Sequence, residues 1–176
     1  MSLAAYKDRR YEVGPCNTNW PREFEAAADK LRTVFGSTAD IQHIGSTAVP
    51  GMDGKPVIDI LVLVDNVSAA ETHRQEIENL GYVYAGEFVM PGAILFRKMN
   101  GDTLLSNVHI FERSHPHVRE MLRLRDYLRD NPGEAKAYSD LKRDLYAKYK
   151  DCYAEYRKRK DEYMASLKKR AEGAHS

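Results

Sequence analysis

Residues 57–64 are almost continuously apolar, with a single acidic residue, Asp59, near the start of the run. Such a run is typical of a strand that is buried on both faces. A second strand is expected over residues 41–44, and a turn of small residues separates the two. Because an ionised carboxylate is costly to bury without a cation or hydrogen-bond donors, we expect Asp59 at an open strand end or in contact with a ligand.

Apolar residues at helical spacing predict a helix that begins after Asn19, its expected cap, and ends at Gly36. Ser68 and Glu71 have the spacing of a capping box, which predicts a second helix that ends at Gly81. Three short strands are expected over 82–85, 93–99 and 103–111. The dipeptide 100–101, Asn-Gly, predicts a type I′ turn between the last two, so the sheet is expected to be mixed.

The last third of the chain has a helical pattern throughout. Pro116 opens one helix, and the sequence Asn-Pro-Gly at 131–133 ends it. From Glu134 a long helical pattern follows, with apolar residues at intervals of three and four, which need burial against other elements. We therefore predict one domain over 1–176, of the α/β (α+β) class, with 134–170 as an integral helical extension that covers the site or forms a homodimer interface.

Charge is distributed unevenly along the chain. The formal net charge is +1, but residues 134–170 carry twelve Lys and Arg against seven Asp and Glu. A basic helical segment can bind phosphate or nucleic acid, whereas the acidic residues interspersed in this segment favour a solvent-exposed helix face. Nucleic acid is therefore the less favoured partner.

The two cysteines, Cys16 and Cys152, form no C-x-x-C pair, and we interpret both as structural free thiols. With no secretory segment recognised and no apolar run near the roughly 20 residues that a bilayer span requires, we expect a cytoplasmic protein without a membrane segment.

The turn and its flanking strands carry a specific motif: His-Ile-Gly-Ser-Thr-Ala-Val-Pro-Gly at 43–51, followed by Lys-Pro-Val-Ile-Asp-Ile at 55–60. Further matches are Asn-Trp-Pro at 19–21, the strand with His109, Leu-Arg-Asp-Tyr-Leu-Arg at 124–129, and Tyr138 with Leu-Lys-Arg at 141–143. This ordered set resembles the GrpB family, also called UPF0157, and the resemblance covers most of the chain.

The resemblance implies a nucleotidyltransferase-like fold, in which a Gly-Ser turn precedes an acidic strand. It implies that the turn binds the phosphate groups of a nucleotide or another phosphorylated small molecule, and that Asp59 holds a divalent metal ion such as Mg²⁺. The candidate catalytic and metal-binding residues are Asp59 and His109. The candidate ligand-binding residues are His43, Gly45, Ser46, Thr47, Lys55 and Arg125.

One departure from the superfamily pattern bears on activity. The second acidic residue, expected two positions after Asp59, is replaced by Leu61, and one carboxylate rarely confines two metal ions. Three functions stay open: nucleotide binding with transfer of a nucleotidyl group, a catalytically silent module that senses a ligand or binds a partner enzyme, and a metal-dependent enzyme of other chemistry built on Asp59 and the histidines. Some members of the GrpB family are fused to dephospho-CoA kinase, and the resemblance therefore supports the hypothesis of a module that binds a partner enzyme.

Overall fold

The computed structural model describes residues 11–36, 39–87 and 90–174. Its centre is a five-stranded sheet in the order β1-β2-β5-β4-β3. The strands are β1 (Asp40–Ile44), β2 (Ile58–Val64), β3 (Tyr82–Gly86), β4 (Ala93–Asn100) and β5 (Thr103–Glu112). Strands β2 and β5 run parallel, and the other neighbours are antiparallel. The predicted mixed sheet is confirmed.

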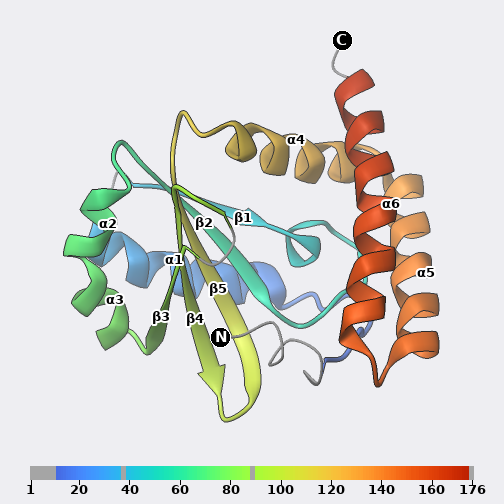
Figure 1. Ribbon diagram of the computed structural model, residues 1–176, viewed down its shortest axis with the longest axis horizontal. Coiled ribbons are helices and arrows are strands. Elements are labelled where there is room, and N and C mark those ends of the chain that lie inside the picture. Colours follow the sequence, from blue (N-terminus) through green and yellow to red (C-terminus); the bar gives the residue numbers. More distant parts are fainter. Residues whose placement is uncertain (1–10, 37–38, 88–89, 175–176) are drawn as a thin grey trace.

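Three helices cover one face of the sheet (Figure 1): α1 (Trp20–Phe35), α2 (Ser68–Thr72) and α3 (Arg74–Asn79). The apolar stripe of α1, including Phe24 and Leu31, packs on Ile60 and Val108 in the main core. The predicted N-terminal helix is confirmed, but the Asn19 side chain makes no capping hydrogen bond.

The helix predicted over 68–81 is wrong in detail, because the chain breaks at His73 into α2 and α3. Neither piece has a side-chain cap, so the predicted capping box does not form. The side chain of Asn66 instead accepts a hydrogen bond from the backbone N–H of Ser68 at 2.8 Å. A competing local hydrogen bond of this kind is what makes Asn favourable before a helix.

Helix α4 (Pro116–Asp130) covers part of the opposite face, where Val118 packs on Leu61 and Phe111. Strands β4 and β5 are joined through Gly101 and Asp102, since Asn100 is still paired with Thr103. Only the glycine has a positive φ, 55°. The hairpin is therefore confirmed, whereas its turn lies one residue further along than the type I′ prediction.

The expected long C-terminal helix is in fact two helices, α5 (Pro132–Tyr149) and α6 (Tyr153–Gly173), which lie side by side (Figure 1). Tyr138 of α5 stacks on Tyr163 of α6, with 5.5 Å between ring centroids. Both helices pack on Val49 and Met52, just after the small-residue turn. This contact brings the C-terminal segment to the turn that carries the family motif.

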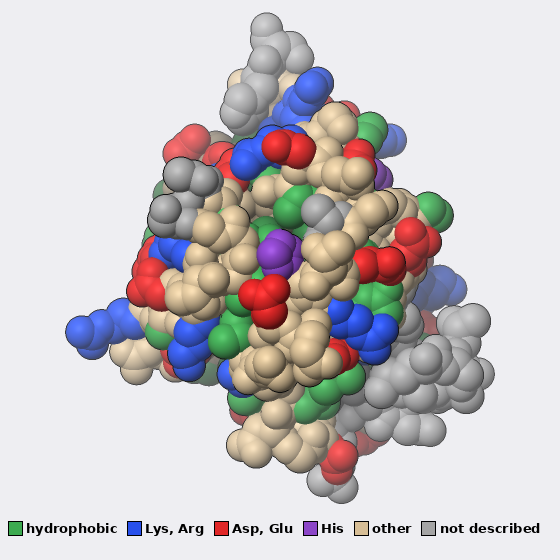
Figure 2. Space-filling model, turned by 90° about the vertical axis from the view of Figure 1, so that its left-hand side faces the viewer, with side chains coloured by type: hydrophobic (Ala, Val, Ile, Leu, Met, Phe, Trp, Pro, Cys, Tyr) green, Lys and Arg blue, Asp and Glu red, His purple; other side chains and the backbone are tan. Residues whose placement is uncertain are grey.

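No helix in the described part of the chain is long and apolar enough to span a membrane. On the face formed by α2 and α3, acidic and basic side chains are interspersed (Figure 2).

Candidate functional site

The turn after β1 passes directly over the carboxylate of Asp59. Its first residue, Gly45, is exposed and has φ 74° and ψ −171°, a conformation that is essentially restricted to glycine. A Cβ atom at this position would lie 2.7 Å from Oδ2 of Asp59. The turn then continues into η2 (Ser46–Ala48), whose Ser46 is half-buried. A glycine is therefore required here both by the backbone conformation and by the approach to Asp59.

Two side chains of β5 contact Asp59. The register sets Asn107 opposite Asp59 and His109 opposite Leu61. Asn107 Nδ2 donates to Asp59 Oδ1 at 2.7 Å, and His109 Nε2 lies 3.5 Å from the same oxygen. Burial opposes ionisation of Asp59, but the hydrogen bond and charge of His109, together with Asn107 and Lys55, bring its pKa below the ordinary value. The carboxylate is held ionised.

Leu61 occupies the position of the missing second acid. It is fully buried and packs with Ile44 and Phe111 in the core beneath α4. The replacement of the second acidic residue by Leu61 therefore does more than remove a charge, because an apolar side chain in the core occupies the position of the second carboxylate.

His43 and Thr47 face the interior. His43 is 7% exposed and stacks on Phe24, with ring centroids 4.5 Å apart. Its Nε2 lies 2.9 Å from the Thr47 hydroxyl, which donates to the Val57 carbonyl at 3.4 Å. Burial lowers the pKa of His43 to about 4, with Arg129 and Arg125 adding to the effect against the opposing charge of Asp59. At neutral pH this uncharged imidazole ties the turn to β1.

Arg125 and Lys55 are each engaged with neighbouring elements. Arg125 donates from α4 to the Gln42 side chain and to the His43 carbonyl, at 3.0 and 3.2 Å. One helical turn later, Arg129 Nε donates to the Ala48 carbonyl at 2.9 Å. Lys55 Nζ donates to the Tyr153 hydroxyl of α6 at 3.0 Å. Arg125 thus ties the end of β1 to α4, Arg129 ties the turn to the same helix, and Lys55 joins the loop before β2 to α6.

A residue that sequence reasoning did not assign to the site, Lys142 of α5, contacts the turn directly. It is 2% exposed, and its Nζ donates to Ser46 Oγ at 2.9 Å and to the Asp53 carbonyl. Two signals were present in the sequence: Lys142 lies in the matched Leu-Lys-Arg segment, and it follows the apolar Tyr138 by four residues. Its side chain is also over the ring of Tyr138, 4.7 Å from the centroid.

Asp53 fixes this arrangement through all of its polar groups. Its backbone N–H donates to Ser139 Oγ at 3.0 Å, and its carbonyl accepts from Lys142. Its carboxylate accepts from the Cys16 N–H at 3.1 Å and pairs with Arg143. The loop, the N-terminal segment and α5 are thereby joined at one buried residue.

Within the described ranges, no three His, Cys, Asp or Glu side chains form a group able to hold a metal ion. Asp59 and His109 supply two potential ligands. The side chains of the described residues alone therefore do not make up a complete metal site.

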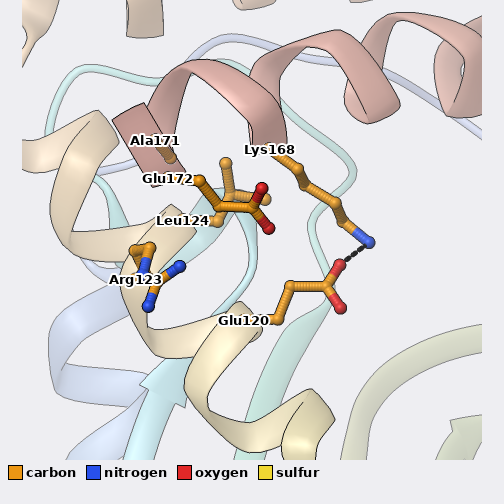
Figure 3. A pocket seen from close by; sticks show the side chains of 6 residues that line it. All are labelled: Glu120, Arg123, Leu124, Lys168, Ala171 and Glu172. Atoms are coloured by element: carbon orange, nitrogen blue, oxygen red, sulfur yellow. Dashed lines mark ion pairs between the residues drawn. The ribbon is translucent and has the colours of Figure 1, made fainter. Parts of the chain in front are cut away.

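A separate small pocket lies between α4 and α6 (Figure 3). Glu120 and Lys168 form an ion pair at its edge. None of the predicted site residues contributes to its lining, which consists of Glu120, Arg123, Leu124, Lys168, Ala171 and Glu172.

The sequence and the fold have counterparts in known proteins. A family model described as GrpB protein matches residues 10–170. This chain belongs to the GrpB family. It is 34% identical over 167 residues to the UPF0157 protein YqkA of Bacillus subtilis, and the alignment covers 94% of this chain and 48% of YqkA. The chain thus spans about half the length of that GrpB relative.

Solved structures show the same fold. The crystal structure of GrpB from Enterococcus faecalis matches with a TM-score of 0.87 and 31% identity, covering 93% of this chain and 99% of that one. A structure of the Cid1 poly(U) polymerase bound to MgATP matches with a TM-score of 0.53 and 15% identity, covering 78% and 45%. The GrpB chain therefore has a nucleotidyltransferase-like fold, as the sequence resemblance implied.

Proposed function

We propose that this GrpB protein binds the phosphate groups of a nucleotide or another phosphorylated small molecule at the Gly45–Ser46 turn. The observation that carries the proposal is the 2.9 Å contact between Lys142 Nζ and Ser46 Oγ. A buried ammonium costs free energy unless something offsets its desolvation. A phosphate beside the half-buried Ser46 would supply that compensation, with the serine hydroxyl as a hydrogen-bond donor to it.

Positive charge from three elements supports this ligand class. Lys55 before β2, Lys142 on α5 and Lys160 on α6 lie close enough for the charges of Lys55 and Lys160 to lower the pKa of Lys142. The carboxylate of Asp53, the acid that opposes them, is itself paired with Arg143. The local excess of cations favours an anion, and a nucleotide with several phosphates satisfies it better than a neutral ligand.

We infer that binding without nucleotidyl transfer is the activity that the site favours. In-line transfer needs metal ions that neutralise charge on the attacking and leaving oxygens. Leu61 is buried in the core where a second carboxylate would be needed, and Asn107 already hydrogen-bonds the remaining one. A ligand-sensing or partner-binding module, such as one that regulates another enzyme, fits these residues.

A second candidate rests on the approach of His109 to Asp59 at 3.5 Å. A carboxylate and an imidazole are both ligands for divalent cations, and Mg²⁺ commonly binds with one or two carboxylates, waters and phosphate oxygens. A cation held by Asp59 would thus bind together with the phosphorylated ligand. The proposal predicts weak metal binding by the protein alone.

Titration calorimetry with ATP, UTP, GTP, CTP and pyrophosphate, each with and without Mg²⁺, tests the function. Lys142→Met retains most of the side-chain volume without the charge, and Ser46→Ala removes the hydroxyl. Each is expected to weaken binding roughly tenfold to a hundredfold, as loss of a charge-assisted hydrogen bond implies. Lys136→Met, at an exposed position of the same helix, is the matched control and should bind normally.

Two outcomes would contradict the proposed binding function. Failure of every probe to bind at millimolar concentration would remove the phosphate site. Incorporation of labelled nucleotide into an acceptor, abolished by Asp59→Asn, would establish transfer and contradict the silent module.

A further inference from the structure

The ammonium of Lys142 is buried among neutral partners. Its hydrogen bonds go to the Ser46 hydroxyl and the Asp53 carbonyl, and the Tyr138 ring lies beside it. In the described part of the structure, no carboxylate oxygen comes within 4.0 Å of its Nζ. Neutral acceptors offset the cost of a buried charge less well than a carboxylate does. The charged form of Lys142 is therefore poorly compensated in the ligand-free protein.

The charged groups around Lys142 come from each element packed against it. Lys160 approaches from α6 and is itself paired with Asp161 at 3.1 Å. Lys55 approaches from the loop before β2, and Asp53 from the same loop is the opposing acid. Burial and the charge of Lys160, with a smaller contribution from Lys55 against that of Asp53, lower the pKa of Lys142 to about 7. Burial therefore favours loss of the proton from Lys142 in the ligand-free protein.

We propose that an anionic ligand binds at Ser46 together with a proton, which Lys142 takes up from solvent. This inference rests on the proposed phosphate site and specifies how that site is regulated. A phosphate next to Ser46 brings negative charge close to Nζ, and an opposite charge favours the protonated amine. The bound state then holds the proton over a pH range in which the free state has lost it.

The direction of the pH dependence follows from this linkage. Below about pH 7 the lysine is already protonated, so binding takes up little proton. Above that value the free protein is deprotonated and the complex is not, so affinity falls by up to about tenfold per pH unit. The site would bind anions well in a mildly acidic medium and release them as the medium becomes alkaline.

Calorimetry with ATP at pH 8, where the nucleotide phosphates are almost fully ionised, measures the proton directly. HEPES and Tris differ in ionisation enthalpy, so titrations in the two buffers should give different binding heats. The difference should be roughly 0.5–1 times the difference in ionisation enthalpy, which corresponds to uptake of roughly 0.5–1 proton per site. Lys142→Arg keeps its charge at every pH and is expected to bind without proton uptake.

A second measurement needs no ligand. The ¹³Cε resonance of Lys142, assigned by comparison with Lys142→Met, should titrate near pH 7 instead of near the ordinary value of about 10.4. ATP binding with equal heats in the two buffers at pH 8 would overturn the proton linkage and leave the phosphate site standing. An ordinary titration of the lysine would also overturn the linkage. Absence of binding by every anion would instead remove the proposed function.

Discussion

The side-chain amide of Asn107 donates a hydrogen bond to Asp59 Oδ1 at 2.7 Å, across the parallel pair β2 and β5. One oxygen of the carboxylate is thus occupied by the protein itself. The other, Oδ2, faces the Gly45 turn. Oδ2 is therefore the oxygen through which Asp59 would contact a ligand at the proposed site.

Asp59→Asn is expected to leave the fold intact, because the new amide oxygen can still accept from Asn107. The free energy of unfolding at pH 7 should change by less than about 1 kcal/mol, and metal-assisted ATP binding should weaken. Chemical denaturation and Mn²⁺ titration in the presence of ATP measure the two effects. Asp65→Asn, at an exposed residue just after the same strand, is the control. Unchanged metal affinity would assign Asp59 a structural role.

Acidification should destabilise the protein through His43. The pKa of His43 is lowered to about 4 in the folded state, so the unfolded state binds more protons between pH 6.5 and 4. Stability contributed by the neutral form is full above about pH 6.5 and is lost as the pH falls. The expected cost between pH 7 and pH 5 is about 2 kcal/mol.

His43→Gln tests this origin, because glutamine keeps an amide donor near Thr47 but does not titrate in this range. Urea denaturation at pH 7 and pH 5 should show a smaller pH effect in the variant than in the wild type. His73→Gln, at a half-exposed histidine, serves as the control. An equal loss of stability in His43→Gln and wild type would show that other groups cause the acid sensitivity.

Gly45→Ala should be more harmful than Gly51→Ala, although both glycines have φ near 74°. A Cβ at residue 45 meets Asp59 Oδ2, whereas one at residue 51 meets nothing within 4 Å. We expect a cost of roughly 3 kcal/mol at residue 45 and roughly 1 kcal/mol at residue 51. Thermal and urea denaturation of the two variants provide the comparison, and equal costs would mean that the contact with Asp59 is relieved by a small shift.

Truncation after Asn131 should impair folding, because it removes α5 and α6 from the apolar surface around Val49 and Met52. We expect a broader unfolding transition and lower solubility. A shortened chain that melted as sharply as the whole protein and bound the same anions would contradict an integral role for 134–170. Light scattering on the intact chain tests the predicted homodimer, which a monomeric mass would exclude.

Local patterns in the sequence predicted the strands and the first helix because each carries its own periodicity or stop signal. The end of α5 carries no such signal, because residues 150–152, Lys-Asp-Cys, contain neither glycine nor proline. The helical pattern of the sequence continues through these residues, so it does not predict that the chain reverses direction there. The break at His73 was missed for the same reason.

The site depends on relationships that no local pattern contains. Lys142 and Ser46 are 96 residues apart, and they meet because α5 packs beside the turn. Asn107 reaches Asp59 through the register of parallel strands. The family motif located Gly45, Ser46 and Asp59, whereas these partners required the tertiary arrangement.

The four hydrogen bonds of Asp53 also determine how the protein opens. Cys16, Ser139 and Lys142 are all bound to this one residue, so separating α5 from the loop breaks contacts on both sides at once. In native-state hydrogen exchange, the amides of Cys16 and Asp53 should therefore lose protection in the same opening event. That event would also carry the lysine away from Ser46, so a bound anion would slow exchange at amides that it does not touch.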